Sequence, residues 1–408
     1  MRFAIPIVLS LLAGTLSIAL PQELTTTAIP VAASSDVDEA TDQLAQLSEF
    51  AKEQVNAVLE HSKNKRGGCT LSKLSIRKEW GSLTNTQRKA YTDAVLCLQA
   101  KPPQTPTSLI PGARSRFDDW VGSHILRTPF IHYTGNFLAW HRYYIWTYEQ
   151  ALRNECGYTG YQPYWDWAKT AATGLDTSPI FDGSAYSMGS NGAPIAGQGN
   201  IVLQFGDLPP IVLPSGSGGG CVTSGPFKDM EVTLGPVALA LTDGTTVGNG
   251  DGLSYNPRCL KRDLTRAINQ RYANATSVVK LILTSPDIWQ FQMTMQGNPG
   301  TDEIGVHGGG HYTIGGDPGR DAFISPGDPA FYLHHGMIDR VWWIWQMLDR
   351  ETRTGADGIS GTETLLNFPP SENTTMDTPV TMGYAGGPDL PMRDLMDTTK
   401  GPFCYIYL

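Results

Sequence analysis

The sequence predicts a mainly α-helical protein with long irregular loops and few short strands. Two observations lead to this prediction. In four segments, residues 38–59, 84–98, 136–153 and 328–349, apolar residues recur at three- and four-residue steps, which is the period of an amphipathic helix. Residues 170–258, by contrast, are rich in Gly, Pro and Ser and show no helical or long strand pattern, so we expect a loop-rich insertion that forms part of a pocket rim.

Each predicted helix has its own signals. The first one places its apolar residues on a single face; these are Leu44, Leu47, Phe50, Ala51, Val55 and Leu59. The second begins at Thr84, whose hydroxyl suits an N-cap. The fourth begins at Asp328, a residue type that caps helices, and Pro329 then suits the first turn. No internal repeat divides the chain, so we expect residues 37–408 to form one domain.

The N-terminus has the pattern of a secretory signal peptide, predicted here as residues 1–19. Arg2 is followed by an apolar run and then by the small residues Ser17 and Ala19. A membrane anchor is the alternative, but the apolar run is shorter than the ~20 residues that span a bilayer. Residues 20–36 lack periodicity and are expected to be flexible. We therefore predict a secreted, extracellular protein without a membrane segment.

Charge and cysteine content narrow the function classes. The formal net charge is −9 and no block of Lys or Arg occurs, which argues against nucleic acid or an anionic membrane as partner and favours a small-molecule substrate. Six cysteines show no metal-ligand spacing, and in an oxidising compartment they predict structural disulfides with the pairing left open. Two glycosylation triplets begin at Asn274 and Asn373. The sequence leaves the oligomeric state unknown.

Seven of the eight histidines fall into two clusters, and this is the strongest signal in the chain. The clusters are His124, His132 and His141, and His307, His311, His334 and His335. His307 and His311 are four residues apart, so on a helix their rings share one face and can bind one ion. Imidazoles without carboxylate or thiolate partners suit copper or zinc. Two three-histidine sites favour a pair of coppers, and a structural zinc protein is the distant alternative.

Several residues beside the histidines are candidates for supporting roles. Asp339 lies four residues after His335 and suits a carboxylate that orients the ring. Phe137 lies one turn before His141, where packing alone would also explain it. Glycines 308, 309 and 310 cost the helix about 1 kcal/mol each relative to Ala. In return, we expect them to leave open space beside the ligands.

Two stretches resemble the copper-binding signatures of a known family. Residues 132–142 (HYTGNFLAWHR), with His124 upstream, and residues 328–342 (DPAFYLHHGMIDRVW), downstream of His307 and His311, resemble those of the fungal short-type tyrosinases and catechol oxidases. These are type-3 copper proteins of the superfamily that also includes haemocyanin. The stretches 76–80 (IRKEW), 164–167 (YWDW) and 405–407 (YIY) match the same family. The resemblance spans residues 65–408.

The resemblance implies a central helical bundle that holds a dicopper site, with the insertion and a few short strands around it. One copper ion would be held by His124, His132 and His141, and the second by His307, His311 and His335. His335 is preferred to His334 because the family ligand lies four residues before the Asp of an Asp-Arg pair. His334, Phe331 and Phe137 are then expected near the ligands. The implied activity is oxidation of o-diphenols to o-quinones by O2, which is reduced to water.

Two departures from the family pattern make the predicted activity more specific. Members that hydroxylate monophenols often carry an Asn after the first histidine of the second site and an upstream Glu, whereas Gly308 and Gln292 stand here. We therefore predict a catechol oxidase with small phenolic substrates and weak monophenol hydroxylation. No cysteine neighbours His132, so a Cys–His thioether is not expected, although a link to Cys97 stays open. The chain stops after the YIY stretch, from which open substrate access is expected.

Three alternative functions share these residues. A tyrosinase with monophenol hydroxylase activity and an o-aminophenol oxidase would use the same copper chemistry. A haemocyanin-like O2 carrier would keep the ligands but block access of an aromatic ring to them.

Overall fold

The computed structural model describes residues 29–30, 32–61 and 68–408. The predicted signal peptide, residues 1–19, lies outside these residues, as does most of the 20–36 segment. The described end of that segment is held in place, because the Ser34 N–H donates a hydrogen bond of 3.0 Å to Oε1 of Gln43. Residues 32–36, which we expected to lack structure, are therefore attached to the first helix.

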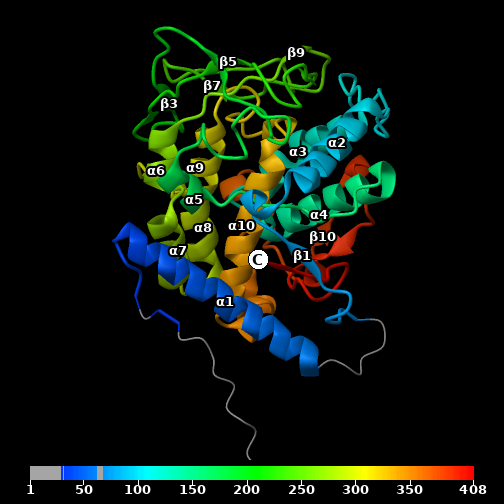
Figure 1. Ribbon diagram of the computed structural model, residues 1–408, viewed down its shortest axis with the longest axis vertical. Helices are drawn as coiled ribbons and strands as arrows, with labels where there is room; N and C mark the ends of the chain where they lie inside the picture. The colour runs from blue at the N-terminus through cyan, green and yellow to red at the C-terminus, as the bar shows by residue number, and fades with distance from the viewer. Residues whose placement is uncertain (1–28, 31, 62–67) are drawn as a thin grey trace, which may run out of the picture.

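Helices dominate the described chain (Figure 1). They are α1 (Val37–His61), α2 (Asn85–Ala100), α3 (Arg116–Ile131), α4 (Phe137–Cys156), α5 (Trp167–Thr173), α6 (Arg266–Tyr272), α7 (Ala275–Thr284), α8 (Ile288–Gln296), α9 (Gly305–Ile314), α10 (Ala330–Met347) and α11 (Arg350–Arg353). The four helices predicted from periodicity correspond to α1, α2, α4 and α10, so this part of the prediction is confirmed. Helices α6, α7 and α8 were not predicted, because each is too short for apolar residues to show a helical period.

Of the two predicted N-cap residues, Thr84 is confirmed and Asp328 is not. At α2 the prediction is confirmed, because the Thr84 hydroxyl accepts from the Gln87 N–H and the Gln87 side chain accepts in return from the Thr84 N–H, which is a capping box. At α10 the N-cap is Pro329 and not Asp328. The Asp328 carboxylate still accepts from the Ala330 N–H at 2.8 Å, but it also pairs with the buried Arg262.

Helix α10 forms the centre of the fold. Every one of its residues is buried, and it packs against α4, α1, α7 and α9 (Figure 1). A helix that is buried on all sides needs neighbours on every face, and its polar residues, such as Asp339 and Gln346, need partners within the core. Helices α3, α4, α9 and α10 thereby come together around one point, and these are the elements that carry or adjoin the seven clustered histidines.

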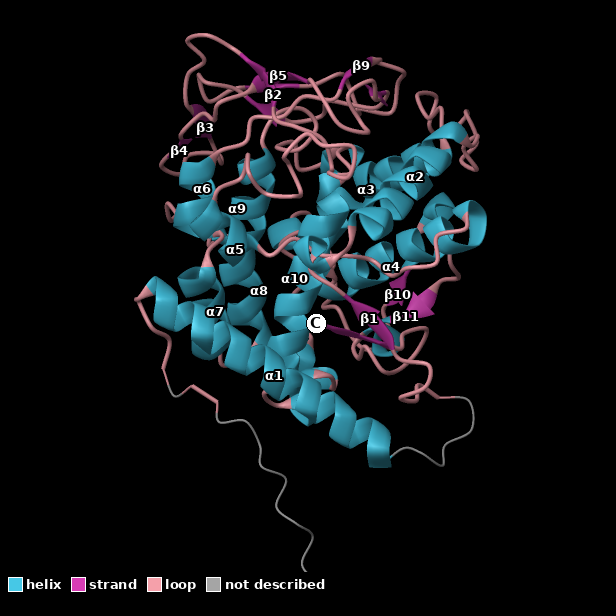
Figure 2. Cartoon of the chain, viewed as in Figure 1, coloured by secondary structure: helices cyan, strands magenta, loops and turns pink. Residues whose placement is uncertain are grey.

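The strands are short and form two-stranded sheets only. They are β1 (Ser75–Arg77), β2 (Gly192–Pro194), β3 (Ile201–Leu203), β4 (Ile211–Leu213), β5 (Gly219–Val222), β6 (Glu231–Val232), β7 (Leu239–Ala240), β8 (Thr246–Val247), β9 (Arg258–Cys259), β10 (Pro379–Val380), β11 (Leu390–Pro391) and β12 (Tyr405–Tyr407). Figure 2 shows β2, β3, β4, β5 and β9 in a loop-rich layer at one end of the helices. The predicted insertion at 170–258 is thus loop-rich with small antiparallel pairs.

The two ends of the domain are joined by strands and by a disulfide. Strand β1 pairs in parallel with β12, with Ser75 opposite Tyr405 and Arg77 opposite Tyr407. Next to this pair, Cys69 is bonded to Cys404. The last strand therefore closes the domain against a segment more than three hundred residues upstream.

All six cysteines form disulfides. Cys97 on α2 is bonded to Cys156 at the end of α4, and Cys221 is bonded to Cys259 in the loop-rich layer. The sequence prediction of structural disulfides is confirmed. Because Cys97 is already paired, the possible link between Cys97 and a histidine is ruled out in this structure. Within the described residues, no helix has the length and apolarity needed to cross a membrane.

Candidate metal centre

The first histidine cluster is built by α3, the turn after it, and α4. His124 lies on α3, His132 is the C-cap of α3, and His141 lies on α4. Each ring places Nδ1 against a backbone carbonyl oxygen, at 2.8 Å from Phe323, 3.1 Å from Thr128 and 2.7 Å from Phe137, respectively. An N–H donated from Nδ1 fixes the tautomer and leaves Nε2 free to bind a metal.

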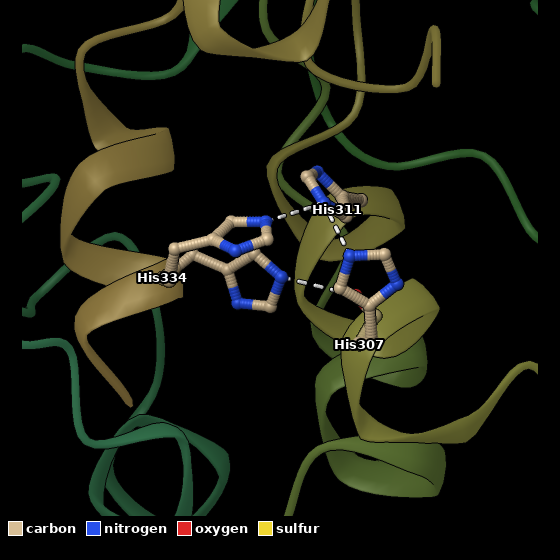
Figure 3. A group of neighbouring side chains, drawn as sticks. His307, His311 and His334 are labelled. Atoms are coloured by element: carbon tan, nitrogen blue, oxygen red, sulfur yellow. Dashed lines mark hydrogen bonds between the residues drawn. The ribbon is translucent and has the colours of Figure 1, made fainter. Parts of the chain in front are cut away.

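The second cluster faces the first from α9 and α10. Nε2 of His311 lies 3.2 Å from Nε2 of His307 and 3.2 Å from Nε2 of His335. Nε2 of His334 instead contacts the backbone oxygen of His307, at 3.0 Å. Figure 3 shows His307 and His311 on one helix, with His334 reaching toward them from the other. The ligand atoms of all four histidines lie within 4.8 Å of one another.

The rings of the two clusters meet face to face in the core. The rings of His141 and His335 are stacked with centroids 4.6 Å apart, and the His132 and His307 centroids are 5.8 Å apart. Phe331 stacks on His335 at 4.1 Å, and the Phe137 ring contacts His307 edge-on at 5.0 Å. Both phenylalanines therefore lie against ligand-type rings, as the resemblance implied, and Phe137 contributes its carbonyl as well.

Burial sets the protonation state of these rings. Desolvation lowers the pKa of His132 to about 4 and that of His311 to about 3. For His124, His141 and His335, burial also lowers the pKa, and the neighbouring histidines lower it further. The rings are therefore neutral at pH 7, which is the form that binds a metal.

The glycines of α9 serve close packing more than open space. A Cβ atom at position 310 would lie 2.2 Å from the His334 ring, and one at position 309 would lie 2.8 Å from Tyr272. Gly308 alone lines a cavity. We expected all three glycines to leave space beside the ligands. This is wrong for Gly309 and Gly310, because neighbouring side chains occupy the space next to them.

Asp339 does not contact the ring that it was expected to orient. Its carboxylate accepts hydrogen bonds from Arg142 at 2.6 Å, Tyr405 at 2.6 Å and Tyr407 at 2.5 Å, and it pairs with Arg77 at 3.3 Å. Burial alone would raise its pKa, but the two arginines and the two tyrosine hydrogen bonds together outweigh burial and lower the pKa. Nδ1 of His335 is buried without a hydrogen-bond partner among the described residues. Asp339 does lie one helical turn after His335, but residues from other parts of the chain bind its carboxylate.

A cavity of about 600 Å³ opens beside the histidines. His132, His307, His311 and Gly308 line its inner end, while Val202, Leu203, Phe205 and Leu208 from the loop-rich layer line its outer part. The expectation that the insertion contributes to a pocket rim is therefore confirmed. The cavity is large enough for an aromatic ring with a substituent.

Gln292, which sequence reasoning had singled out, lies away from this cavity. It is buried on α8, and its amide donates to the Ser360 carbonyl oxygen at 2.6 Å. Gln296, one turn later, lines the cavity and was missed. Its Oε1 accepts from the Tyr133 N–H at 2.8 Å and its Nε2 donates to the Gln292 carbonyl oxygen at 3.1 Å. Gln296 lies four residues after Gln292, so on a helix the two share one face, and this spacing was the signal that could have found it.

The positions of the histidine nitrogens suit metal binding better than hydrogen bonding between the rings. Nε2 of His124 and of His141 are buried without a hydrogen-bond partner in the described chain. Nε2 of His311 has two nitrogen neighbours at 3.2 Å, yet one imidazole nitrogen carries either one hydrogen or one lone pair and can satisfy only one of them. Imidazole nitrogens bound to one ion at about 2 Å lie roughly 3.3 Å apart. The cluster therefore has the spacing of a metal site.

Comparisons with known proteins identify the family. The sequence model for the common central domain of tyrosinase matches residues 114–348. Tyrosinase P of Aspergillus terreus is 42% identical over 338 residues, which cover 81% of this chain and 91% of that protein. N-acetyl-6-hydroxytryptophan oxidase of Emericella nidulans is 40% identical over 350 residues, 83% of this chain and 93% of that protein.

A solved structure agrees with both sequence comparisons. A mutant of the polyphenol oxidase from Thermothelomyces thermophila superimposes with a TM-score of 0.83 at 48% identity, and the match covers 91% of this chain and 98% of that chain. The mainly helical fold predicted from the sequence is the fold of that enzyme. The chain therefore belongs to the fungal tyrosinase family of type-3 copper oxidases, and its two groups of buried histidines fit the dicopper centre that this family implies.

Proposed function

We propose that this oxidase is a secreted catechol oxidase that converts o-diphenols to o-quinones. When bound, the two copper ions pass electrons from the phenol to O2. Two catechols together give up four electrons and four protons, and one O2 takes them up to form two waters. The observation that carries this choice is the lining of the cavity beside His307, which offers no buried carboxylate among the described residues.

A monophenol has to lose its proton before it can be hydroxylated, and a nearby base assists this step. Glu303 is the one carboxylate in the described lining, and it is exposed. Gln296 is uncharged, and its amide is already used by Tyr133 and Gln292. Gly308 adds no polar group next to His307. These three positions, Glu303, Gln296 and Gly308, support oxidation of catechols with weak monophenol hydroxylation.

The ligands we propose are His124, His132 and His141 for one copper, and His307, His311 and His335 for the other. The contact of His334 with the His307 carbonyl oxygen supports a positioning role for His334, since Nε2 is already engaged. The test is copper analysis of two neighbouring variants. His335→Ala should lower the copper content from two ions per chain toward one, while His334→Ala should retain two. The reverse pattern would reject this assignment.

Substrate choice is tested by oxygen uptake with methylcatechol, methylphenol and o-aminophenol. We expect rapid uptake with the catechol and slow uptake with the monophenol. Fast oxidation of the monophenol without a lag would make the chain a tyrosinase. Faster oxidation of o-aminophenol than of the catechol would make it an o-aminophenol oxidase.

Two observations bear on the remaining alternatives. The cavity that reaches His132, His307 and His311 supports an enzyme over a haemocyanin-like O2 carrier, which would need to block such access. The name of the Emericella nidulans relative indicates a hydroxylated indole with a carboxylate as substrate. Its similarity to this chain supports substrates that are larger than catechol itself and that carry an acidic group.

We also propose that residues 1–19 are removed as a signal peptide, that residues 20–36 precede the domain, and that residues 37–408 form one copper domain. Three disulfides support an oxidising, extracellular destination. Sequencing the N-terminus of protein recovered from culture medium tests the cleavage. An intact Met1 on the recovered protein would contradict it.

A further inference from the structure

The cavity beside the histidines contains one unusual charge. Its described lining is apolar or uncharged apart from the histidines and two residues, Glu303 and Arg320. Glu303 is exposed, whereas Arg320 is half-buried. The cavity wall that adjoins the metal centre thus presents one guanidinium to whatever enters.

Arg320 has no partner for its charge among the described residues. Its Nε is buried without a hydrogen-bond partner, and no ion pair joins its guanidinium to a carboxylate in the described chain. The nearest acids are engaged elsewhere. Asp317 forms a two-point pair with Arg258 at 2.6 and 2.9 Å, and Asp263 accepts from the Gly216 N–H at 2.9 Å.

Other buried arginines have the carboxylate partner that Arg320 lacks in the described structure. Arg262 is fully buried and holds the Asp328 carboxylate with two bonds of 2.7 Å, and Arg142 holds Asp339 at 2.6 Å. A guanidinium that is taken out of water without such a partner costs free energy. For Arg320, burial accordingly lowers the pKa, and the neighbouring Tyr312, Asp263 and Asp317 compensate only in part. A ligand carboxylate would supply the missing partner.

Arg320 also lies close to the metal centre. The backbone of Gly319, the preceding residue, is hydrogen-bonded to the ring of His311. Tyr312, which follows His311, lines the same cavity and interacts electrostatically with Arg320. An aromatic ring bound next to His307 and His311 therefore has the guanidinium within the same enclosed space.

We propose that Arg320 binds the carboxylate of the substrate, so that the preferred substrates are catechols whose ring carries a short acidic side chain. This inference rests on the proposed catechol oxidase function and adds a substrate class to it. Arginine suits the role because its planar fork of N–H groups matches both oxygens of a carboxylate. The described lining around it is largely apolar and carries no other buried charge, which strengthens the pair by limiting its contact with water.

The test compares dihydrocaffeic acid with its methyl ester, which keeps the catechol ring and the chain but replaces the negative charge by a methyl group. For the wild-type copper-loaded enzyme, kcat/KM should favour the acid by about tenfold, the lower range of one charge-assisted hydrogen bond. In Arg320→Gln the ratio of kcat/KM for the acid to that for the ester should fall to nearly one. Arg320→Lys should retain part of the preference for the acid. Arg271→Gln is the matched control, since it removes an exposed positive charge that is paired with Asp302 outside the cavity lining. It should keep the preference.

A binding measurement separates this inference from the proposed function. Phenylpropanoic acid has no phenolic hydroxyl group and cannot be converted to a quinone, so calorimetry reports its binding without turnover. We expect Arg320→Gln to weaken this binding by about tenfold and Arg271→Gln to leave it unchanged. An acid preference or acid binding that is equal in wild type and Arg320→Gln would overturn the role of Arg320. Absence of catechol oxidation with Arg320-dependent acid binding would overturn the catechol oxidase function alone.

Discussion

Two glycines of the same helix should respond to alanine in opposite ways. Gly308 and Gly310 both lie within α9, so either substitution to Ala gains about 1 kcal/mol of helix propensity. At position 308 the new Cβ would approach the Ile304 Cβ to 3.0 Å, a contact that a small shift relieves. At position 310 it would lie 2.2 Å from two atoms of the His334 ring.

The His334 ring has no room to move away. It is fully buried, and the rings of Trp167 and His311 lie with centroids 5.2 and 4.5 Å from it. Overpacking of this kind costs about 1–3 kcal/mol, and displacing the ring also endangers its bond to the His307 carbonyl oxygen, a further ~1 kcal/mol. After subtracting the gain in helix propensity, we expect Gly310→Ala to lose about 1–3 kcal/mol.

Denaturant unfolding of the copper-free variants, followed by tryptophan fluorescence, measures the difference directly. Gly308→Ala should be as stable as wild type or slightly more stable, and Gly310→Ala should be clearly less stable. Copper analysis gives a second readout, since a displaced His334 would disturb the neighbouring ligands. Equal stability of the two alanine variants would refute the claim that Gly310 is required for close approach of the His334 ring.

Three further predictions concern the support of the site. Asp339→Asn should destabilise the protein by about 3–5 kcal/mol, because it leaves Arg142 without its buried carboxylate. Since the Asp339 pKa is lowered in the fold, its stabilisation is present above about pH 4 and is lost as the pH falls through the folded pKa, so acid titration of unfolding should show a smaller slope in the Asn variant. Replacing Cys97 and Cys156 by Ser should cost about 4 kcal/mol for a loop of this length, measured by thermal unfolding with the other disulfides intact. Thr84→Ala should cost about 1 kcal/mol in the same assay, and no loss would mean that the capping box contributes nothing.

Local features of the fold could be predicted because they depend on neighbours in sequence. The capping box at Thr84 joins residues three apart, and His307 and His311 face one another because a helix brings residues four apart together. The same local argument failed for Asp339. Its true partners include Arg77 and Tyr407, whose positions depend on the parallel pairing of β1 with β12, and no local pattern encodes that pairing.

The candidate site was predictable in its residue types but not in its finer division of roles. His334 and His335 are adjacent, and both rings lie beside His311. Only the three-dimensional packing shows that Nε2 of His335 approaches Nε2 of His311, whereas Nε2 of His334 contacts the His307 carbonyl oxygen. Arg320 left no trace in the sequence analysis. Its distinguishing property is the absence of a partner in the described structure, and that property exists only once Asp317 and Asp263 are seen to be engaged elsewhere.

Asp339 nevertheless bears on the candidate metal centre, although its carboxylate bonds to arginines and tyrosines and not to a histidine. Arg142 follows His141 on α4, and Asp339 lies one turn after His335 on α10, so the 2.6 Å bond between Arg142 and Asp339 ties together the helices that carry the two clusters. The stacked rings of His141 and His335, with centroids 4.6 Å apart, depend on the spacing of those helices. A carboxylate expected to orient one ring therefore joins the two helices that carry His141 and His335, and it supports the site through the packing of those helices and not through contact with a ring.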